Sequence, residues 1–233
     1  MLTRRNFVAR IGLAAAGVSV LQEVASAQQA PVGGDLPAET VWLNANEYPE
    51  GPPEAVVRAM SEALPISNRY NYREMPNFNA TLAHSVELAP DQIMVGAGST
   101  EVLHCAQHAF TSPTNPLIAL DLTYEKPLEL SRTLGRRMIR VPLRADYTVD
   151  VRRLVAAAEK AGGGLIYLCN PNNPTSVAIS RQDLGWLVGH LPTNAILLVD
   201  EAYIEFVDAA DVETALGYVR QGKNVIVTRT FSK

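Results

Sequence analysis

The sequence predicts an α/β protein with a mostly parallel sheet that is covered by helices on both faces. Six short apolar runs alternate with helical stretches along the chain. Runs of about four apolar residues are typical of strands that are buried on both sides, as in parallel sheets. Because parallel neighbours need crossover connections, the intervening helices cover both faces of the sheet. With 47% apolar residues, the chain is able to bury such a core.

The expected elements follow from the spacing of the apolar residues. Between Pro53 and Leu64 they recur at helical spacing, and the early proline suits the first turn of a helix. Strands are expected at Ile93–Val95, Leu117–Leu120, Met138–Val141, Leu165–Leu168, Ile196–Val199 and Val225–Val227. Helices are expected at 53–64, 78–88, 101–110, 126–134, 150–161, 181–190 and 212–221.

Composition narrows the range of partners and of metal or redox chemistry. A formal net charge of −4 lacks the basic excess that nucleic acid or an anionic membrane requires, so small molecules are the expected partners. Cys105 and Cys169 lack the spacing of a zinc site, and they form either one bridge or, as is commoner, two buried free thiols. His104 and His108 share one face of an expected helix, but no third ligand stands near them. We therefore interpret them as surface histidines and predict no metal site.

The N-terminal segment resembles a twin-arginine export signal. Arg4 and Arg5 precede a modest apolar run, Ile11–Leu21, which is followed by the small-x-small pattern of Ala25–Ala27. A membrane-spanning helix is the alternative, but the run is about half of the ~20 residues that a bilayer requires. We therefore expect a signal peptide at 1–27, a flexible arm at 28–40 and a domain at 41–233, exported to the periplasm or secreted, with no membrane anchor after cleavage.

Polar residues follow the predicted strands, at the sheet edge where parallel α/β proteins bind ligands. The turn Gly96–Thr100 opens a helix, and its amides suit a phosphate. The turn could instead be a simple tight connection. It is not a complete dinucleotide-binding fingerprint, because that pattern needs a third glycine. Tyr124 follows the next strand, as a stacking ring or as part of the core. The polar, proline-containing turn Asn170–Thr175 follows a later strand.

Charged and hydroxyl groups follow the last two predicted strands. Asp200 ends an apolar strand, where a carboxylate is costly unless a cation pairs with it, and Tyr203 lies three residues on. Two hydroxyls and an amine, those of Thr230, Ser232 and Lys233, follow the last strand. Together with the phosphate cradle, the ring and the amide turn, these groups fit pyridoxal phosphate.

The motifs GAGSTE, TYEKP, NPNNPT, DEAYIEF and RTFSK occur in this order along the chain. As an ordered set they resemble the class I/II aminotransferases of fold type I, and together with the segments 41–52 and 68–70 they are most similar to the histidinol-phosphate aminotransferases. The resemblance covers about residues 41 to 233. It implies a pyridoxal-phosphate-dependent homodimer that moves an amino group between an amino acid, or a histidinol-phosphate-like amino-alcohol phosphate, and a 2-oxo acid.

The resemblance also implies a role for each motif residue. Lys233 would bind the cofactor covalently and then shuttle a proton at the α-carbon of the substrate. Asp200 would pair with the pyridine nitrogen. The side chains implied around the ring are Tyr203 and Asn173 as donors to its phenolic oxygen and Tyr124 stacked on its face. The remaining implied residues are Ser99, Thr100, Thr230 and Ser232 at the phosphate, and Tyr48 and Tyr70 at the substrate or across the dimer interface.

Two departures from the family pattern affect the interpretation. Ser176 replaces the glycine of the usual NPTG, so its backbone either avoids positive φ or accepts a cost of order 1 kcal/mol, and we expect a local adjustment. The sequence ends at Lys233, whereas the family continues with a strand, a phosphate-binding arginine and a small C-terminal domain. The expectation is an exported transaminase whose sequence is incomplete here. The alternatives are a truncated, non-catalytic remnant and a related pyridoxal-phosphate decarboxylase or lyase.

Overall fold

The computed structural model describes residues 41, 45–70, 72 and 74–233. The predicted signal peptide and arm, residues 1–40, lie outside the described residues. Glu47–Lys233 form one compact unit. No helix within the described part is long and apolar enough to span a membrane.

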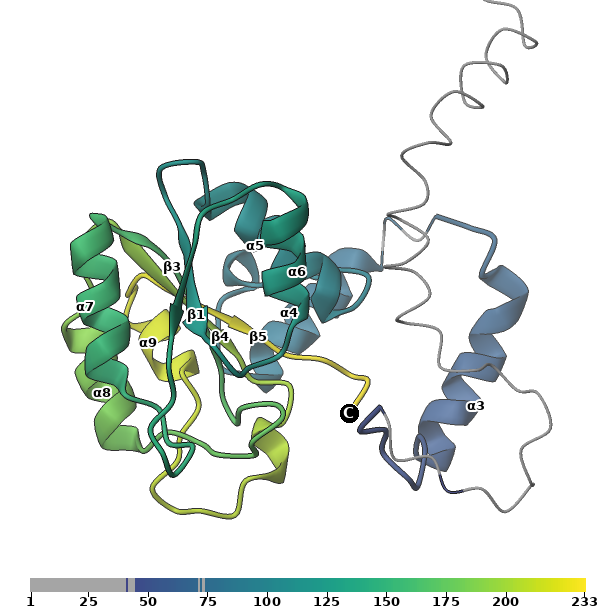
Figure 1. Cartoon of the computed structure of the whole chain (residues 1–233). Coiled ribbons are helices and arrows are strands. Elements are labelled where there is room, and N and C mark those ends of the chain that lie inside the picture. Colours follow the sequence, from purple (N-terminus) through teal and green to yellow (C-terminus); the bar gives the residue numbers. More distant parts are fainter. Residues whose placement is uncertain (1–40, 42–44, 71, 73) are drawn as a thin grey trace, which may run out of the picture. The chain divides into compact units, whose positions relative to one another are not determined.

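A five-stranded parallel sheet forms the centre of this unit (Figure 1). Its order is β2-β1-β3-β4-β5, and every neighbouring pair is parallel. The strands are β1 Leu117–Leu120, β2 Met138–Val141, β3 Gly164–Cys169, β4 Ala195–Asp200 and β5 Val225–Thr228. The predicted fold class is therefore confirmed.

The strand order creates a switch point between β1 and β3. The chain leaves β1 for β2 on one side, and then crosses back to place β3 on the other side of β1. Connections that diverge in this way leave a crevice beyond the carboxyl ends of the two strands, which is where open α/β sheets bind ligands.

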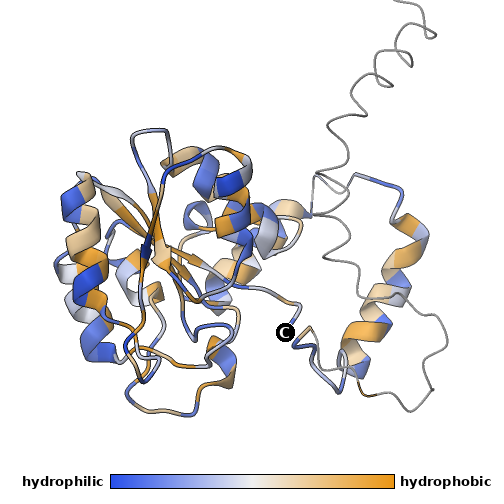
Figure 2. Ribbon diagram, in the orientation of Figure 1, coloured by the Kyte–Doolittle hydropathy of each residue, from blue (hydrophilic) through white to orange (hydrophobic). Residues whose placement is uncertain are grey.

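Helices cover both faces of the sheet, as Figure 1 shows. One face packs against α5 (Ser99–Phe110) and α6 (Lys126–Thr133), and the other against α7 (Val151–Ala161), α8 (Arg181–Gly189) and α9 (Leu216–Arg220). In Figure 2 the strands are predominantly apolar, while the helices α7 and α8 carry hydrophilic residues away from the sheet. The helices α3 (Glu54–Ala63) and α4 (Met75–Ser85) precede this core in the chain.

Helix α7 illustrates how the sequence defines these elements. The Asp150 carboxylate caps the helix by accepting the backbone N–H of Arg153 at 3.2 Å, and Gly162 ends it with a left-handed φ of 77°. Its buried positions recur every three or four residues and bring one apolar stripe onto the sheet. These positions are Val151, Leu154, Val155 and Ala158.

Three expectations differ from the structure. Residues 93–95 form no strand: Ile93 has extended backbone angles, but no described strand pairs with it, and a strand is defined by its partner. Helix α4 begins and ends three residues earlier than the predicted 78–88. Helix α9 covers only Leu216–Arg220 of the predicted helix 212–221, because Thr214 and Ala215 donate hydrogen bonds to Glu201 instead.

Candidate functional site

Asp200 is a buried carboxylate at the carboxyl end of β4. The residue is only 3% exposed. Because side chains alternate along a strand, the Asp200 side chain lies on the face of the sheet that α5 and α6 cover. It accepts hydrogen bonds from the Tyr167 hydroxyl at 2.9 Å and from the Ala202 N–H at 3.3 Å. Burial raises the pKa of Asp200, and these bonds oppose that rise. No Lys, Arg or His among the described residues forms an ion pair with it.

Asn173 and Tyr203 meet beyond the carboxyl ends of β3 and β4. The Asn173 amide nitrogen lies 3.5 Å from the Tyr203 hydroxyl, although the two residues come from the turns after β3 and β4. The turn after β3 is held by Asn170, whose side-chain oxygen accepts the N–H of Ile179 at 2.9 Å. The structure thus brings together an amide and a phenol that the sequence placed at separate strand ends.

Tyr124 lies between the start of α5 and Asp200. Its ring is half-buried and packs against the apolar cluster of that face. Burial is the main cause that raises its pKa; the Thr100 hydroxyl lowers it, and the Asp200 carboxylate adds to the rise. Tyr124 therefore packs against the core while its hydroxyl contacts a polar group, and its role as a stacking ring stays a prediction.

The N-terminus of α5 forms a concave backbone turn. Gly98 has a left-handed φ of 79°, and a Cβ on Gly96 would lie 2.8 Å from the Val102 side chain, so both positions favour glycine. No side chain caps the helix, which begins at Ser99. The Glu101 carboxylate accepts the amide of Ala97, so the amides of the first helical turn are the ones suited to an anion.

Lys233 follows β5 at the rim of a cavity of about 640 Å³. Thr230 lines the same cavity, and its hydroxyl bonds that of Ser232 at 2.8 Å. The cavity extends along β5 toward the apolar residues Ile93 and Met94. The predicted amine and hydroxyls therefore lie together in one segment beyond the last strand.

Glu201 and Arg229 form a buried ion pair to which the sequence analysis assigned no role. The Glu201 side chain is 0% exposed and accepts from the Arg229 guanidinium at 3.0 Å, the Thr214 hydroxyl at 2.7 Å and the Ala215 N–H at 2.6 Å. Burial raises the pKa of Glu201, and these donors lower it. Two features of the sequence could have indicated this pair. A second acidic residue directly follows Asp200, and an arginine directly follows the last strand.

Tyr48 and Tyr70 do not join the site. Tyr48 is exposed and donates to Glu50 at 3.1 Å, which raises its pKa. Tyr70 is 86% exposed and stacks on Tyr72 at a centroid distance of 5.5 Å. Neither is among the described residues that line the cavity beside Lys233.

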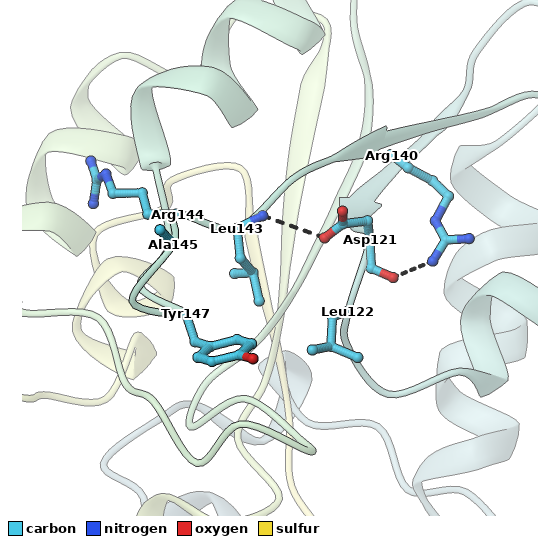
Figure 3. Close-up of a pocket in the computed structure, with 7 residues that line it drawn as sticks. All are labelled: Asp121, Leu122, Arg140, Leu143, Arg144, Ala145 and Tyr147. Carbon is cyan, nitrogen blue, oxygen red and sulfur yellow. Dashed lines mark hydrogen bonds between the residues drawn. The ribbon is translucent and has the colours of Figure 1, made fainter.

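A second hollow, of about 670 Å³, lies beyond the carboxyl ends of β1 and β2 (Figure 3). The Arg140 guanidinium donates to the Asp121 carbonyl, and the Asp121 carboxylate accepts the Leu143 N–H at 3.3 Å. The Arg144 guanidinium donates to the Val149 carbonyl at 2.9 Å. Both arginines that line this hollow therefore hold the backbone around it.

Ser176 and the two cysteines settle three smaller expectations. Ser176 has a φ of 59°, so the backbone keeps the left-handed conformation and the expected adjustment does not occur. Both cysteines are free. Cys169 is buried, with its pKa raised to about 12 chiefly by burial, but Cys105 is exposed, so the expectation of two buried thiols is wrong for Cys105.

This fold and this set of strand-end groups define the large domain of a fold type I pyridoxal-phosphate enzyme. The sequence profile of the family Aminotransferase class I and II matches residues 38–233, and the chain belongs to this family. A histidinol-phosphate aminotransferase of Ruegeria pomeroyi is 34% identical over 213 residues, which are 91% of this chain and 58% of that protein. An aromatic amino acid aminotransferase of Mycolicibacterium smegmatis is 33% identical and covers 89% of this chain and 58% of its own.

Solved structures agree with these relatives. The histidinol-phosphate aminotransferase of Sinorhizobium meliloti, in complex with pyridoxal-5′-phosphate, is 28% identical with a TM-score of 0.75, over 81% of this chain and 51% of that one. The chain thus spans little more than half the length of the proteins it matches. The family uses pyridoxal phosphate, and the donor set fits it: Tyr124 interacts both with Asp200, a buried carboxylate without an ion pair among the described residues, and with Thr100 in the first turn of α5, which is suited to phosphate.

Proposed function

We propose that the full-length form of this protein is a pyridoxal-phosphate-dependent transaminase. It moves an amino group between an amino donor, either an amino acid or a histidinol-phosphate-like amino-alcohol phosphate, and a 2-oxo acid. The observation that carries this proposal is Asp200, a 3% exposed carboxylate that has no counter-ion among the described side chains. A buried carboxylate is costly unless a cation meets it, and a protonated pyridine nitrogen supplies that cation.

Lys233 and Asp200 carry the chemical roles in this proposal. Pyridoxal phosphate, when bound, withdraws electrons from the α-carbon of the amino substrate. Lys233 would hold the cofactor covalently, and its amine, once released, would move the proton at that α-carbon. Asp200 keeps the ring nitrogen protonated, because its carboxylate lies where no other cation satisfies it.

The other strand-end residues orient the cofactor. Asn173 and Tyr203, already 3.5 Å apart, donate to the phenolic oxygen. Tyr124, which interacts with both Thr100 and Asp200, would lie against the ring face. The first turn of α5, at Ser99 and Thr100, binds the phosphate through its amides, joined by the hydroxyls of Thr230 and Ser232.

Two surface tyrosines support a homodimer. Tyr70 is 86% exposed and Tyr48 is 46% exposed, and neither is among the described residues that line the cavity beside Lys233. In the proposed homodimer these phenols contribute to the substrate site of the neighbouring subunit. Sedimentation gives the mass of the wild type and of Tyr70→Ala, and an activity assay gives their turnover. We expect both to be dimers and the variant to lose turnover. A monomeric wild type would contradict the proposed homodimer.

The N-terminal segment supports export of the protein. The paired arginines, the apolar run and the small-x-small pattern together indicate a twin-arginine signal, and we propose the periplasm or the exterior as its location. Sequencing of the N-terminus of the exported protein should begin at Gln28. Replacement of Arg4 and Arg5 by lysines should retain the protein inside the cell; unchanged export would contradict the proposal.

Covalent labelling tests the cofactor site directly. The chain is incubated with pyridoxal phosphate, reduced with borohydride and digested, and the modified peptide is identified by mass spectrometry. We expect the label on Lys233 and its loss in Lys233→Ala, with Lys223→Ala as a matched control that keeps it. A folded protein that takes no label, or takes it elsewhere, would overturn the assignment and favour a non-catalytic remnant.

A product assay separates transamination from the decarboxylase alternative. With unreduced protein loaded with pyridoxal phosphate, an amino donor and 2-oxoglutarate, a transaminase forms glutamate without releasing carbon dioxide. Carbon dioxide released in step with donor loss would instead support the decarboxylase reading of the same site.

A further inference from the structure

Asp200 is held by a hydroxyl that comes from inside the neighbouring strand. Tyr167 lies in β3, is 0% exposed, and donates its O–H to Asp200 Oδ2 at 2.9 Å. The strand register places Cys169 directly opposite Asp200. Tyr167 lies two residues before Cys169 on the same face, so its long side chain reaches Asp200 diagonally across the strands.

The hydroxyl of Tyr167 has no packing role that phenylalanine could not fill. The ring lies in the apolar cluster between the sheet and α5, with neighbours such as Leu103 and Leu198. Burying a hydroxyl is costly unless a hydrogen bond compensates for it. The Asp200 carboxylate is the acceptor that offsets this cost.

We propose that Tyr167 is a positioning residue that fixes the Asp200 carboxylate in one orientation and in its charged form. Both described hydrogen bonds to this carboxylate, from the Tyr167 O–H and the Ala202 N–H, come from donors, and donors favour the ionised state. A carboxylate that accepts a hydrogen bond is a weaker base. A proton shared with a ring nitrogen therefore stays on the nitrogen, and this last step rests on the proposed function.

The other groups around Asp200 do not compete for this role. Cys169 from β3 and Tyr124 from the turn after β1 both interact electrostatically with Asp200. Burial raises the pKa of each of them, so both are neutral near pH 7. The Thr228 hydroxyl of β5, opposite Asp200 in the register, lowers the pKa of Asp200 less than Tyr167 does and carries no charge. Tyr167 thus supplies a short side-chain hydrogen bond where no neighbour supplies a positive charge.

The test is the pKa of Asp200 in the cofactor-free chain, followed by carbon-13 NMR and assigned with Asp200→Asn. Tyr167→Phe removes one oxygen atom and should raise this pKa by about one unit or more. Tyr218→Phe is the matched control, since it also removes a hydroxyl that donates to a carboxylate, Glu213 at 3.4 Å, although Tyr218 is only half-buried. The control should leave the Asp200 pKa in place.

A second variant covers the case in which Tyr167→Phe does not fold. Site-specific 3-fluorotyrosine at position 167 keeps the ring and makes its hydroxyl a stronger donor, so it should lower the Asp200 pKa. An Asp200 pKa that moves by less than about 0.3 unit in the folded variants, or that moves equally in the control, would overturn the inference.

Measurements with the cofactor separate this inference from the proposed function. In the loaded enzyme, Tyr167→Phe should lower kcat about tenfold and change KM less than about twofold, because the loss affects the ring and not substrate binding. If wild-type protein takes no label at Lys233 while the Asp200 pKa still shifts, the proposed function fails and the role of Tyr167 toward Asp200 stands. If labelling succeeds and neither the pKa nor kcat changes, only the inference about Tyr167 fails.

Discussion

Replacing Arg229 with methionine removes the cation that compensates a fully buried carboxylate. The Glu201 side chain is 0% exposed and lies 3.0 Å from the guanidinium, whose side chain is 29% exposed. Removing one partner of a buried pair typically costs about 3–5 kcal/mol. Since Arg229 is partly solvated and Glu201 keeps the Thr214 and Ala215 donors, we expect Arg229→Met to lower the free energy of unfolding by about 2–3 kcal/mol.

The cost should depend on pH, because protonation relieves the unpaired charge. Burial already raises the pKa of Glu201, and loss of the arginine raises it further. A carboxyl with a raised pKa in the folded state binds more protons folded than unfolded, so its contribution to stability falls as pH rises through that window. The deficit of Arg229→Met should be largest at about pH 8 and shrink toward the ordinary carboxyl range, about pH 4–5.

Urea unfolding followed by circular dichroism at both pH values measures this deficit. Arg58→Met is a matched control, because Arg58 and Glu54 form a 3.3 Å ion pair with side chains 65% and 91% exposed. The control should change the free energy of unfolding by less than about 0.5 kcal/mol. Equal deficits of Arg229→Met at the two pH values, or a deficit no larger than that of the control, would refute the argument from a buried charge.

Three further substitutions or reactions have defined outcomes. Ser176→Gly should raise the free energy of unfolding by about 0.5–1 kcal/mol in urea, because glycine adopts the observed φ of 59° without strain, and a loss of stability would contradict this. A thiol reagent at about pH 8 should modify Cys105 quickly and Cys169 only on unfolding, since Cys169 is buried with a pKa of about 12; equal rates would count against it. Asp200→Ala should weaken pyridoxal phosphate binding at least about tenfold by fluorescence titration, because the ring nitrogen loses its counter-ion, and unchanged affinity would refute that role.

Most of the sheet was predictable because its strands are short apolar runs, of which the central β1, β3 and β4 are buried on both faces and the edge strands β2 and β5 only in part. The runs Leu117–Leu120 and Met138–Val141 match β1 and β2 residue for residue. The run at 93–95 is equally apolar, but it forms no strand, because pairing depends on a neighbouring strand and apolar composition cannot supply one.

The candidate site was predictable only where it coincides with strand ends. Asp200 and Asn173 follow apolar runs, so a rule about the carboxyl ends of parallel strands locates them. Tyr167 lies within a strand, and its contact with Asp200 depends on β3 lying beside β4 in one register. Strand order and register are properties of the assembled sheet, so the sequence alone did not reveal this contact. The φ of Ser176 was likewise decided by the turn around it and not by the residue type.

Consecutive acidic residues at the end of β4 serve opposite faces of the sheet. Asp200 meets Tyr167 on the face covered by α5 and α6, whereas Glu201 binds Arg229 and the Ala215 amide, and Ala215 packs in the cluster of α7 and α8. The Glu201–Arg229 pair therefore joins the ends of β4 and β5, and Arg229 also lines the cavity beside Lys233. Since Asp200 leaves one of these strands and the segment to Lys233 leaves the other, this pair fixes the frame from which both groups extend. The stability of the strand ends and the charge of the site can then change independently, although only one peptide bond separates the two carboxylates.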